Sequence, residues 1–212
     1  MFIASLVSSN LIFQKFFYWT PLSEFTFELS VGILPYPITF LITDIISEIY
    51  GREKANRVVV SGFISSIFIM GIVSIADIAP ATAWSPIDDP TFHKVFGLFG
   101  PAIIASLTAY VTAQFIDIRI FHFWKNLTKG RHLWLRNNGS TIFSQLVDTS
   151  AVLLLLCSFG AIEWMRFLPL LVNGFLFKVL IALVDTPFFY LFSHLLRNVF
   201  QLRVGEELEN ET

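Results

Sequence analysis

Pairs of polar side chains at helical spacing interrupt the longest apolar stretches of this sequence. Residues three, four or seven apart lie on one face of a helix, so each pair forms a single polar stripe. Carboxylates, amides and an amine that face one axis can hold a small polar ligand by hydrogen bonds, or carry a proton. The pairs are Asp44 with Glu48, Gln114 with Asp117, Gln145 with Asp148, and Lys178 with Asp185.

The composition around these pairs is that of a membrane protein. Of 212 residues, 55% are hydrophobic and only 14% are charged, against about 25% charged residues in a soluble domain. A charged side chain at bilayer depth costs on the order of 3 kcal/mol, so each stripe should face the interior of a helix bundle or a wet cavity. We therefore expect an all-α membrane protein with a polar interior.

Six apolar segments approach the roughly 20 residues that a helix needs to cross the hydrocarbon core. They predict a bundle of about six transmembrane helices in one domain over 1–200, followed by an acidic tail over 201–212. Pro35 and Pro37 predict that the second span is kinked or broken in its outer half. The predicted spans are 2–19, 29–50, 57–79, 97–123, 139–160 and 167–196.

The loop charges predict the orientation, because short cytoplasmic loops carry an excess of Lys and Arg. The links between spans two and three and between spans four and five are basic, whereas the 20–28 and 80–96 links are acidic. Both termini should then be cytoplasmic. The basic residues are Arg52, Lys54, Arg57, Lys125, Lys129, Arg131 and Arg136, and the acidic ones are Glu24, Glu28, Asp88 and Asp89 against Lys94.

Other chemistry finds little support in the sequence. Cys157 is the only cysteine, so an intrachain disulfide is excluded, and no pair of the four histidines has metal-ligand spacing. We expect no metal, no cofactor and no nucleic-acid partner.

Several motifs resemble the bacterial queuosine-precursor transporters, also called the vitamin uptake transporter family. The resemblance runs in order along nearly the whole chain. The matching stretches are Pro37 to Asp44, Glu48 to Gly51, Ala55 to Arg57, Ser9-Asn10, Ala109-Tyr110 with Gln114 and Asp117, Trp134 to Asn138 with Ser140, Thr141, Gln145 and Asp148, and Phe177 to Val179.

The resemblance implies a six-span importer in the inner membrane that brings 7-deazaguanines into the bacterial cytoplasm for tRNA modification. These are preQ0, preQ1 or queuine, and the sequence does not choose among them. A deazaguanine presents N–H donors, a carbonyl and a flat ring, which carboxylates, amides, a cation and aromatic rings can bind. The expected substrate-binding residues are Asn10, Asp44, Gln114, Asp117, Arg136, Gln145, Asp148 and Lys178, with an aromatic contact left unassigned.

Structural roles stay open for several of these side chains. Lys178 could form a buried ion pair with Asp148 or Asp185, and Arg136 could pair with Asp117. Glu48 and Asp185 are candidates for a coupling or a structural role, and Glu48 is also four residues from Arg52.

Two other functional classes are weighed against a stand-alone transporter. The chain could be the substrate-binding membrane subunit of an ATP-driven vitamin importer, in which case a partner must supply the ATPase, since the phosphate-binding loop motif is absent here. An intramembrane aspartyl protease built on Asp117 and Asp148 would lack its usual Gly-x-Gly-Asp context. The coupling ion and the formation of a homo-oligomer are left open.

Overall fold

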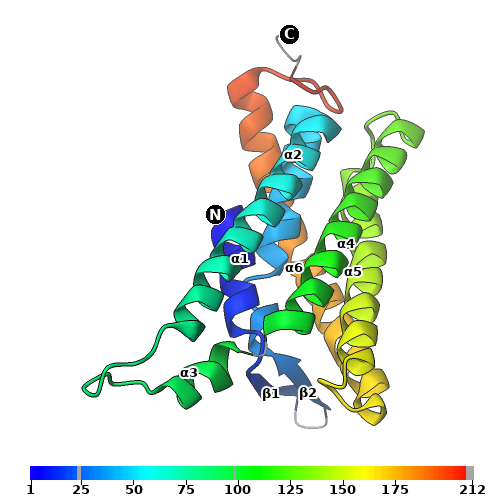
Figure 1. The fold of residues 1–212 in the computed structure, drawn as a ribbon. Coiled ribbons are helices and arrows are strands. Elements are labelled where there is room, and N and C mark those ends of the chain that lie inside the picture. Colours follow the sequence, from blue (N-terminus) through cyan, green and yellow to red (C-terminus); the bar gives the residue numbers. More distant parts are fainter. Residues whose placement is uncertain (23–24, 98, 209–212) are drawn as a thin grey trace.

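The computed structural model describes residues 1–22, 25–97 and 99–208, and the side chains of 22, 25 and 99–105 lie outside the description. The described chain contains six α-helices, two short 3-10 turns and one β-hairpin (Figure 1). The elements are α1 Phe2–Ile12, β1 Phe16–Leu22, β2 Phe25–Ser30, η1 Val31–Ile33, α2 Pro37–Ile78, α3 Asp89–Phe96, α4 Phe99–Leu127, α5 Leu133–Ser158, η2 Trp164–Arg166 and α6 Phe167–Phe200.

The long helices form an elongated bundle of antiparallel neighbours. α4 packs along α5, α5 packs against α6, and α2 contacts α1, α4 and α6. The hairpin lies at one end of the bundle, whereas the α4–α5 link and the C-terminal segment lie at the other (Figure 1). We call these the hairpin end and the tail end.

α2 changes direction at Gly51, whose φ of 80° and ψ of 175° are not helical. Its first arm, 37–50, runs toward the tail end and its second arm, 52–78, returns (Figure 1). Ile42 and Ile46 of the first arm pack in one cluster with Val58 and Val59 of the second. The predicted second and third spans are therefore joined by a reversal at one glycine, not by a loop over 51–56.

The N-terminal region departs from the prediction. α1 has 11 residues, and a helix of that length covers about 16 Å, roughly half of the hydrocarbon core. The predicted helix over 2–19 is wrong, because β1 and β2 pair as an antiparallel hairpin with Trp19 opposite Phe27. The expectation of an all-α fold is likewise wrong at this point, although the chain is mostly helical.

Side-chain alternation explains the hairpin. Phe27 and Leu29 are buried, while Tyr18 on the other strand is exposed. Phe27 packs against Trp19 and against Phe177 of α6, with ring centroids 5.4 Å and 6.4 Å away. Phe27 and Leu29, two positions apart on one face of β2, thus stabilise the hairpin by packing in one cluster with Phe177.

The predicted break in the second span corresponds to the start of α2. Residues 29–33 belong to β2 and η1, and the helix begins at Pro37, where a proline without an N–H is well tolerated. The 29–36 part of the predicted span is therefore not α-helical.

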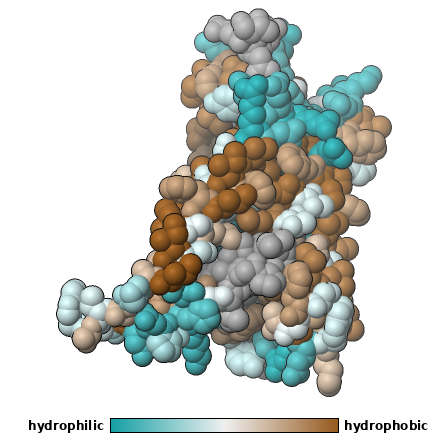
Figure 2. Space-filling view, in the orientation of Figure 1, coloured by the Kyte–Doolittle hydropathy of each residue, from teal (hydrophilic) through white to brown (hydrophobic). Residues whose placement is uncertain are grey.

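The surface has the distribution expected of a membrane protein. Hydrophobic residues cover the middle of the face in Figure 2, and hydrophilic residues gather at both ends. Ile64, Phe68 and Ile75 on the second arm of α2 are 61%, 65% and 71% exposed. Among the described residues, three apolar helical segments are long enough to cross a bilayer: Val31–Ile78, which comprises η1 and both arms of α2, Leu133–Ser158 and Trp164–Phe200.

Gly51→Ala should destabilise the protein. Alanine would have to adopt a backbone region that essentially only glycine occupies, at a cost of order 1–3 kcal/mol, and its Cβ would lie 2.2 Å from Glu207 Oε2. Gly71→Ala is the matched control, because it lies in the second arm with nothing within 4 Å of a new Cβ. The midpoint of thermal unfolding in detergent should fall for Gly51→Ala only, and equal midpoints would show that the reversal tolerates a side chain.

Candidate functional site

A cavity of about 570 Å³ occupies the hairpin half of the bundle. Its walls come from α1, both strands, η1, α5 and α6, with single contributions from Gly97 and from Ser106 of α4. It reaches the surface beside the hairpin and the α5–α6 link, where the lining residues Phe16 and Phe159 are 45% and 51% exposed.

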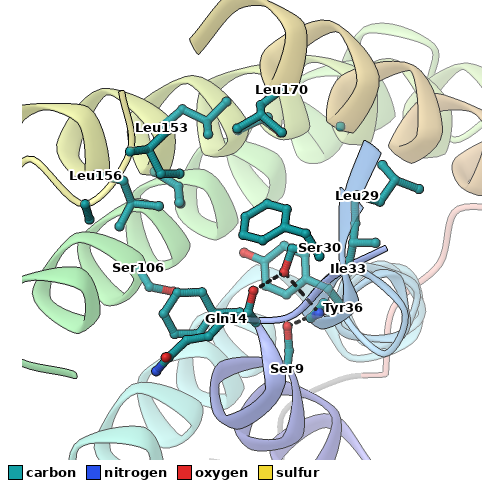
Figure 3. A pocket seen from close by; sticks show the side chains of 18 of the residues that line it. Ser9, Gln14, Leu29, Ser30, Ile33, Tyr36, Ser106, Leu153, Leu156 and Leu170 are labelled. Carbon is teal, nitrogen blue, oxygen red and sulfur yellow. Dashed lines mark hydrogen bonds between the residues drawn. The ribbon is translucent and has the colours of Figure 1, made fainter. Parts of the chain in front are cut away.

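The two sides of the cavity differ in polarity. Leu153, Leu156 and Leu170 form an apolar wall on α5 and α6 (Figure 3). Facing them across the cavity are polar side chains of α1, β2 and the segment before α2 (Figure 3). These polar residues are Ser9, Asn10, Gln14, Ser30 and Tyr36.

The most polar part of the lining is a triad of half-buried Tyr36 with buried Asp148 and Lys178. Lys178 Nζ donates to Asp148 Oδ2 at 2.6 Å, and the Tyr36 hydroxyl donates to Asp148 Oδ1 at 3.0 Å. Lys178 Nζ also lies 4.9 Å from the centre of the Tyr36 ring, within range of a cation–π interaction. Each side chain therefore holds the other two in place.

Short hydrogen bonds fix the polar wall. Ser9 Oγ donates to the Gly32 carbonyl and Ser30 Oγ to the Phe13 carbonyl, each at 2.5 Å, and the Val31 N–H donates to the Lys15 carbonyl at 2.7 Å. A Cβ on Gly32 would lie 2.7 Å from the Ser9 carbonyl oxygen, so glycine permits this approach. The hairpin is thereby tied to the end of α1, just before the turn that presents Tyr36.

A second, much smaller recess lies deeper in the bundle. Asp44, Gln145 and Asp185 line it, with Phe40, Asn137 and Thr141 among its other walls. Its volume of about 20 Å³ has room for about one water molecule. Lys178 lines both hollows, so the two are adjacent.

A network of hydroxyl, amide and carboxyl side chains lies between α2, α4 and α5. Thr43 Oγ1 donates to Gln114 Oε1 at 3.1 Å, and Gln114 Nε2 donates to Thr39 at 3.4 Å. Ser144 donates to Asp117 Oδ1 at 2.9 Å, and Thr141 donates to Asp44 Oδ2 at 3.2 Å. The buried carboxyl groups of Asp44 and Asp117 lie within hydrogen-bonding reach of each other, whereas Gln145 Oε1 is buried without a hydrogen-bond donor among the described residues.

An ion cluster stands apart at the tail end. Glu48 is fully buried and accepts from Arg136 Nη2 at 2.6 Å and from Arg197, while Lys125 Nζ donates to its backbone carbonyl at 3.1 Å. Arg136 also donates to the carbonyls of Gly130 and Arg131. This cluster joins α2, α4, α5 and α6.

The eight expected binding residues thus fall into four places. Asn10, Asp148 and Lys178 line the large cavity, where Asn10 Oδ1 accepts from Ser106 at 3.1 Å. Asp44 and Gln145 line the small recess, and Gln114 and Asp117 lie in the adjoining network. Arg136 lies in the ion cluster at the other end of the bundle.

The structure also shows which of the alternative ion pairs considered from the sequence are formed. Lys178 pairs with Asp148, while Asp185 lines the small recess. Arg136 pairs with Glu48 and not with Asp117. Glu48 has no ion pair with Arg52 in the described structure, because Gly51 ends the helical arm between them.

Sequence reasoning missed Tyr36, Ser30 and Glu28 as cavity residues. Tyr36 stands between Pro35 and Pro37, and this pair of prolines at membrane depth was the available signal. Ser30 and Glu28 gave none, because their role depends on a hairpin that was not predicted. Glu28 lies at the rim of the cavity and pairs with Arg166 at 3.1 Å.

A bundle with long apolar helical segments and a ligand-sized cavity that reaches the Asp148–Lys178 ion pair is the arrangement of a class of proteins, the membrane proteins that bind small polar solutes. The model of the family described as "Putative vitamin uptake transporter" matches residues 30–192. The chain therefore belongs to the vitamin uptake transporter family, which is a family of transporters and not of enzymes.

Three relatives carry the same name in their descriptions. "Queuosine precursor transporter" of Escherichia coli (strain K12) is 28% identical over 209 residues, which are 96% of this chain and 86% of the relative. "Probable queuosine precursor transporter" of Bacillus subtilis (strain 168) is 27% identical over 172 residues, 80% of this chain and 73% of the relative. That of Haemophilus influenzae is 26% identical over 127 residues, 60% of this chain and 51% of the relative. No solved structure matches the chain significantly.

Lys178→Met should destabilise the protein more than the double variant Asp148→Asn/Lys178→Met. Removing one partner of a buried ion pair leaves an uncompensated charge and costs about 3–5 kcal/mol, whereas removing both leaves none. Thermal unfolding in detergent of both single variants, Lys178→Met and Asp148→Asn, and of the double variant checks this order. Additive losses in the double variant would mean that the two charges do not stabilise each other.

Proposed function

We propose that this chain imports queuosine precursors, the 7-deazaguanines preQ0, preQ1 or queuine, across the bacterial inner membrane. The observation that carries the proposal is the cavity whose inner wall is the Tyr36–Asp148–Lys178 triad. Family membership and the names of the relatives supply the substrate class.

The chemistry of the cavity suits such a ligand. A volume of about 570 Å³ lies within the roughly 300–1,000 Å³ of ligand pockets, with room for a fused ring system and a substituent. The Asp148 carboxylate accepts two hydrogen bonds within the protein, and a carboxylate has about four acceptor sites, so it retains capacity for the N–H groups of a guanine-like edge. Tyr36 fills the unassigned aromatic role.

We assign direct contact to Asn10, Tyr36, Asp148 and Lys178. Asp44 and Gln145 act from the adjacent recess through Lys178, while Gln114 and Asp117 hold that recess between α2, α4 and α5. Arg136 and Glu48 serve the closed tail end, and Asp185 remains a candidate coupling residue because it lines the recess beside Lys178.

In the proposed topology, residues 1–200 form one domain whose tail end lies in the cytoplasm. The basic residues of the tail end, Arg52, Lys54 and Lys129, support this orientation. We propose that α1 and β1 together make the first crossing, and that β2 and the first arm of α2 make the second. The strands would lie where water in the cavity and among the lipid headgroups can hydrogen-bond their backbone. Strands could not lie in hydrocarbon with unpaired backbone groups.

Impermeant thiol reagents test this orientation. In a Cys157→Ser background, a cysteine at Thr82 in the 79–88 link should label in intact spheroplasts. A cysteine at Lys54, exposed at the other end, should label only after permeabilisation. The reverse pattern would invert the assignment.

Binding to preQ0, preQ1, queuine and guanine by the purified protein tests the site. Tyr36→Phe should weaken binding of the preferred deazaguanine about tenfold, because a hydrogen bond to a charged group contributes about 1.5–3 kcal/mol. Tyr190→Phe is the matched control, since the Tyr190 hydroxyl bonds the Trp134 N–H outside the cavity.

Three further variants locate the ligand. Asp44→Asn and Gln145→Ala should each lose binding with the fold retained, and so should the double variant Asp148→Asn/Lys178→Met, which leaves no unpaired buried charge. If the double variant binds normally, the triad is not the site. If only the Asp44 and Gln145 variants bind normally, the ligand contacts residues of the large cavity and none of the small recess.

Uptake by the purified chain in liposomes separates the two transport mechanisms. Uptake without ATP or a partner supports a stand-alone carrier. Dependence on an ATPase that copurifies with the chain would favour the alternative, a substrate-binding subunit of an ATP-driven importer.

A further inference from the structure

The C-terminal segment 201–208 folds back over the tail end of the bundle. It crosses that end toward the first arm of α2 (Figure 1, red). The backbone N–H of Leu208 donates to the carbonyl of Ile49, in the last turn of that arm, at 2.8 Å. The segment thus satisfies a helix-end carbonyl that has no partner within the helix.

Two glycines allow the segment to lie on the α4–α5 link. Gly130 and Gly205 have φ of 74° and 87°, and a Cβ on Gly130 would lie 2.7 Å from Gly205 Cα. The backbone of the C-terminal segment is therefore in direct contact with the backbone of the α4–α5 link, which gives the segment a defined position.

Glu207 makes the charged contact between the C-terminal segment and the bundle. Its Oε1 accepts from Lys125 Nζ at 2.9 Å and lies 3.8 Å from His122 Nδ1. Its carboxylate also rests against Gly51, where a Cβ would come within 2.2 Å of Oε2. Glu207 thus joins the turn of α2 to the end of α4.

The same lysine connects Glu207 to the buried ion cluster. Lys125 donates to the Glu48 carbonyl, and Glu48 in turn holds Arg136 and Arg197. By formal charge, these described partners comprise three cations and two carboxylates, one of which is contributed by the tail. Without Glu207, three cations would share the single carboxylate of Glu48.

The two carboxylates differ in how easily they can leave. The Glu48 side chain is 0% exposed and bonded from α5 and α6, whereas the Glu207 side chain is 39% exposed. The Glu207 carboxylate reaches solvent although its partner Lys125 is only 5% exposed, so water can hydrate Glu207 when the pair opens, whereas Glu48 has no such access. Glu48 is therefore the fixed carboxylate of the tail end, and Glu207 is the carboxylate that can be released.

We propose that Glu207 latches the tail end shut while the substrate cavity is open at the hairpin end, and that each transport cycle requires its release. The inference rests on the proposed function, because a carrier must open each end in turn around its site. Within the described chain, the large cavity stops at Lys178, and the ion cluster lies beyond it on the way to the tail end.

A reversible cross-link tests the latch. Lys125→Cys/Glu207→Cys in a Cys157→Ser background is joined by a short bis-methanethiosulfonate linker, whose bonds to cysteine are cleaved by reductant. Lys125→Cys/Glu206→Cys is the matched control, because Glu206 bonds the Arg203 N–H within the tail itself. Uptake into liposomes and equilibrium binding of the preferred deazaguanine are measured before linking, after linking and after reduction.

Linking through position 207 should reduce uptake at least tenfold, reduction should restore it, and binding should change less than twofold. The unlinked protein serves as its own folding control. Normal uptake by the linked Glu207 variant, or equal loss in the Glu206 control, would overturn the latch and leave the proposed function standing. A wild-type protein that neither binds nor takes up any deazaguanine would overturn the proposed function, and the latch with it.

Discussion

The structure depends on the pairing of ionised side chains that a bilayer would otherwise exclude. Asp148 and Lys178 lie 2.6 Å apart at one level of the bundle, and Glu48 and Arg136 lie 2.6 Å apart at another. Unpaired, each charge would cost several kcal/mol to bury. Paired, they connect helices that lipid alone would not hold together, because apolar helices gain little by leaving hydrocarbon for one another.

The two pairs have different surroundings, and this difference separates their roles. Asp148 keeps a further bond from Tyr36 and faces a large hollow, so a ligand can compete for its remaining acceptor capacity. Glu48 is enclosed by cations from α4, α5 and α6, so nothing small can reach it without parting those helices. A carboxylate of the first kind suits recognition, and one of the second kind suits closure.

Helical spacing was enough to predict the polar interior but not its division into four places. The stripes of Asp44, Gln114, Asp117, Gln145 and Asp148 face inward, as predicted from their spacing. Depth along the axis and choice of partner are properties of the packed bundle. Glu48 and Arg197 are 149 residues apart, and no local pattern links them.

The hairpin was missed for a related reason. Residues 16–19 are apolar and aromatic enough to extend a helix, and residues 20–28 have the charge of an acidic link. Only the alternation of Phe25, Phe27 and Leu29 indicates a strand. Short apolar runs are ambiguous between the two, and here the packing against Phe177 decides. Tyr36 could not be placed without that hairpin, because the strands set the direction in which the following turn points.

The hairpin is bonded to the end of α1 through Ser30, Val31 and Gly32, so the two cannot move separately without losing those bonds. At its other end, α1 packs Phe2 and Leu6 against the second arm of α2, where Gly62 leaves room for the Phe2 ring. A hairpin that swings away from the bundle axis must therefore pull α1 across that glycine-lined contact. The packing of Phe2 and Leu6 on α2 therefore restrains the hairpin through the whole length of α1.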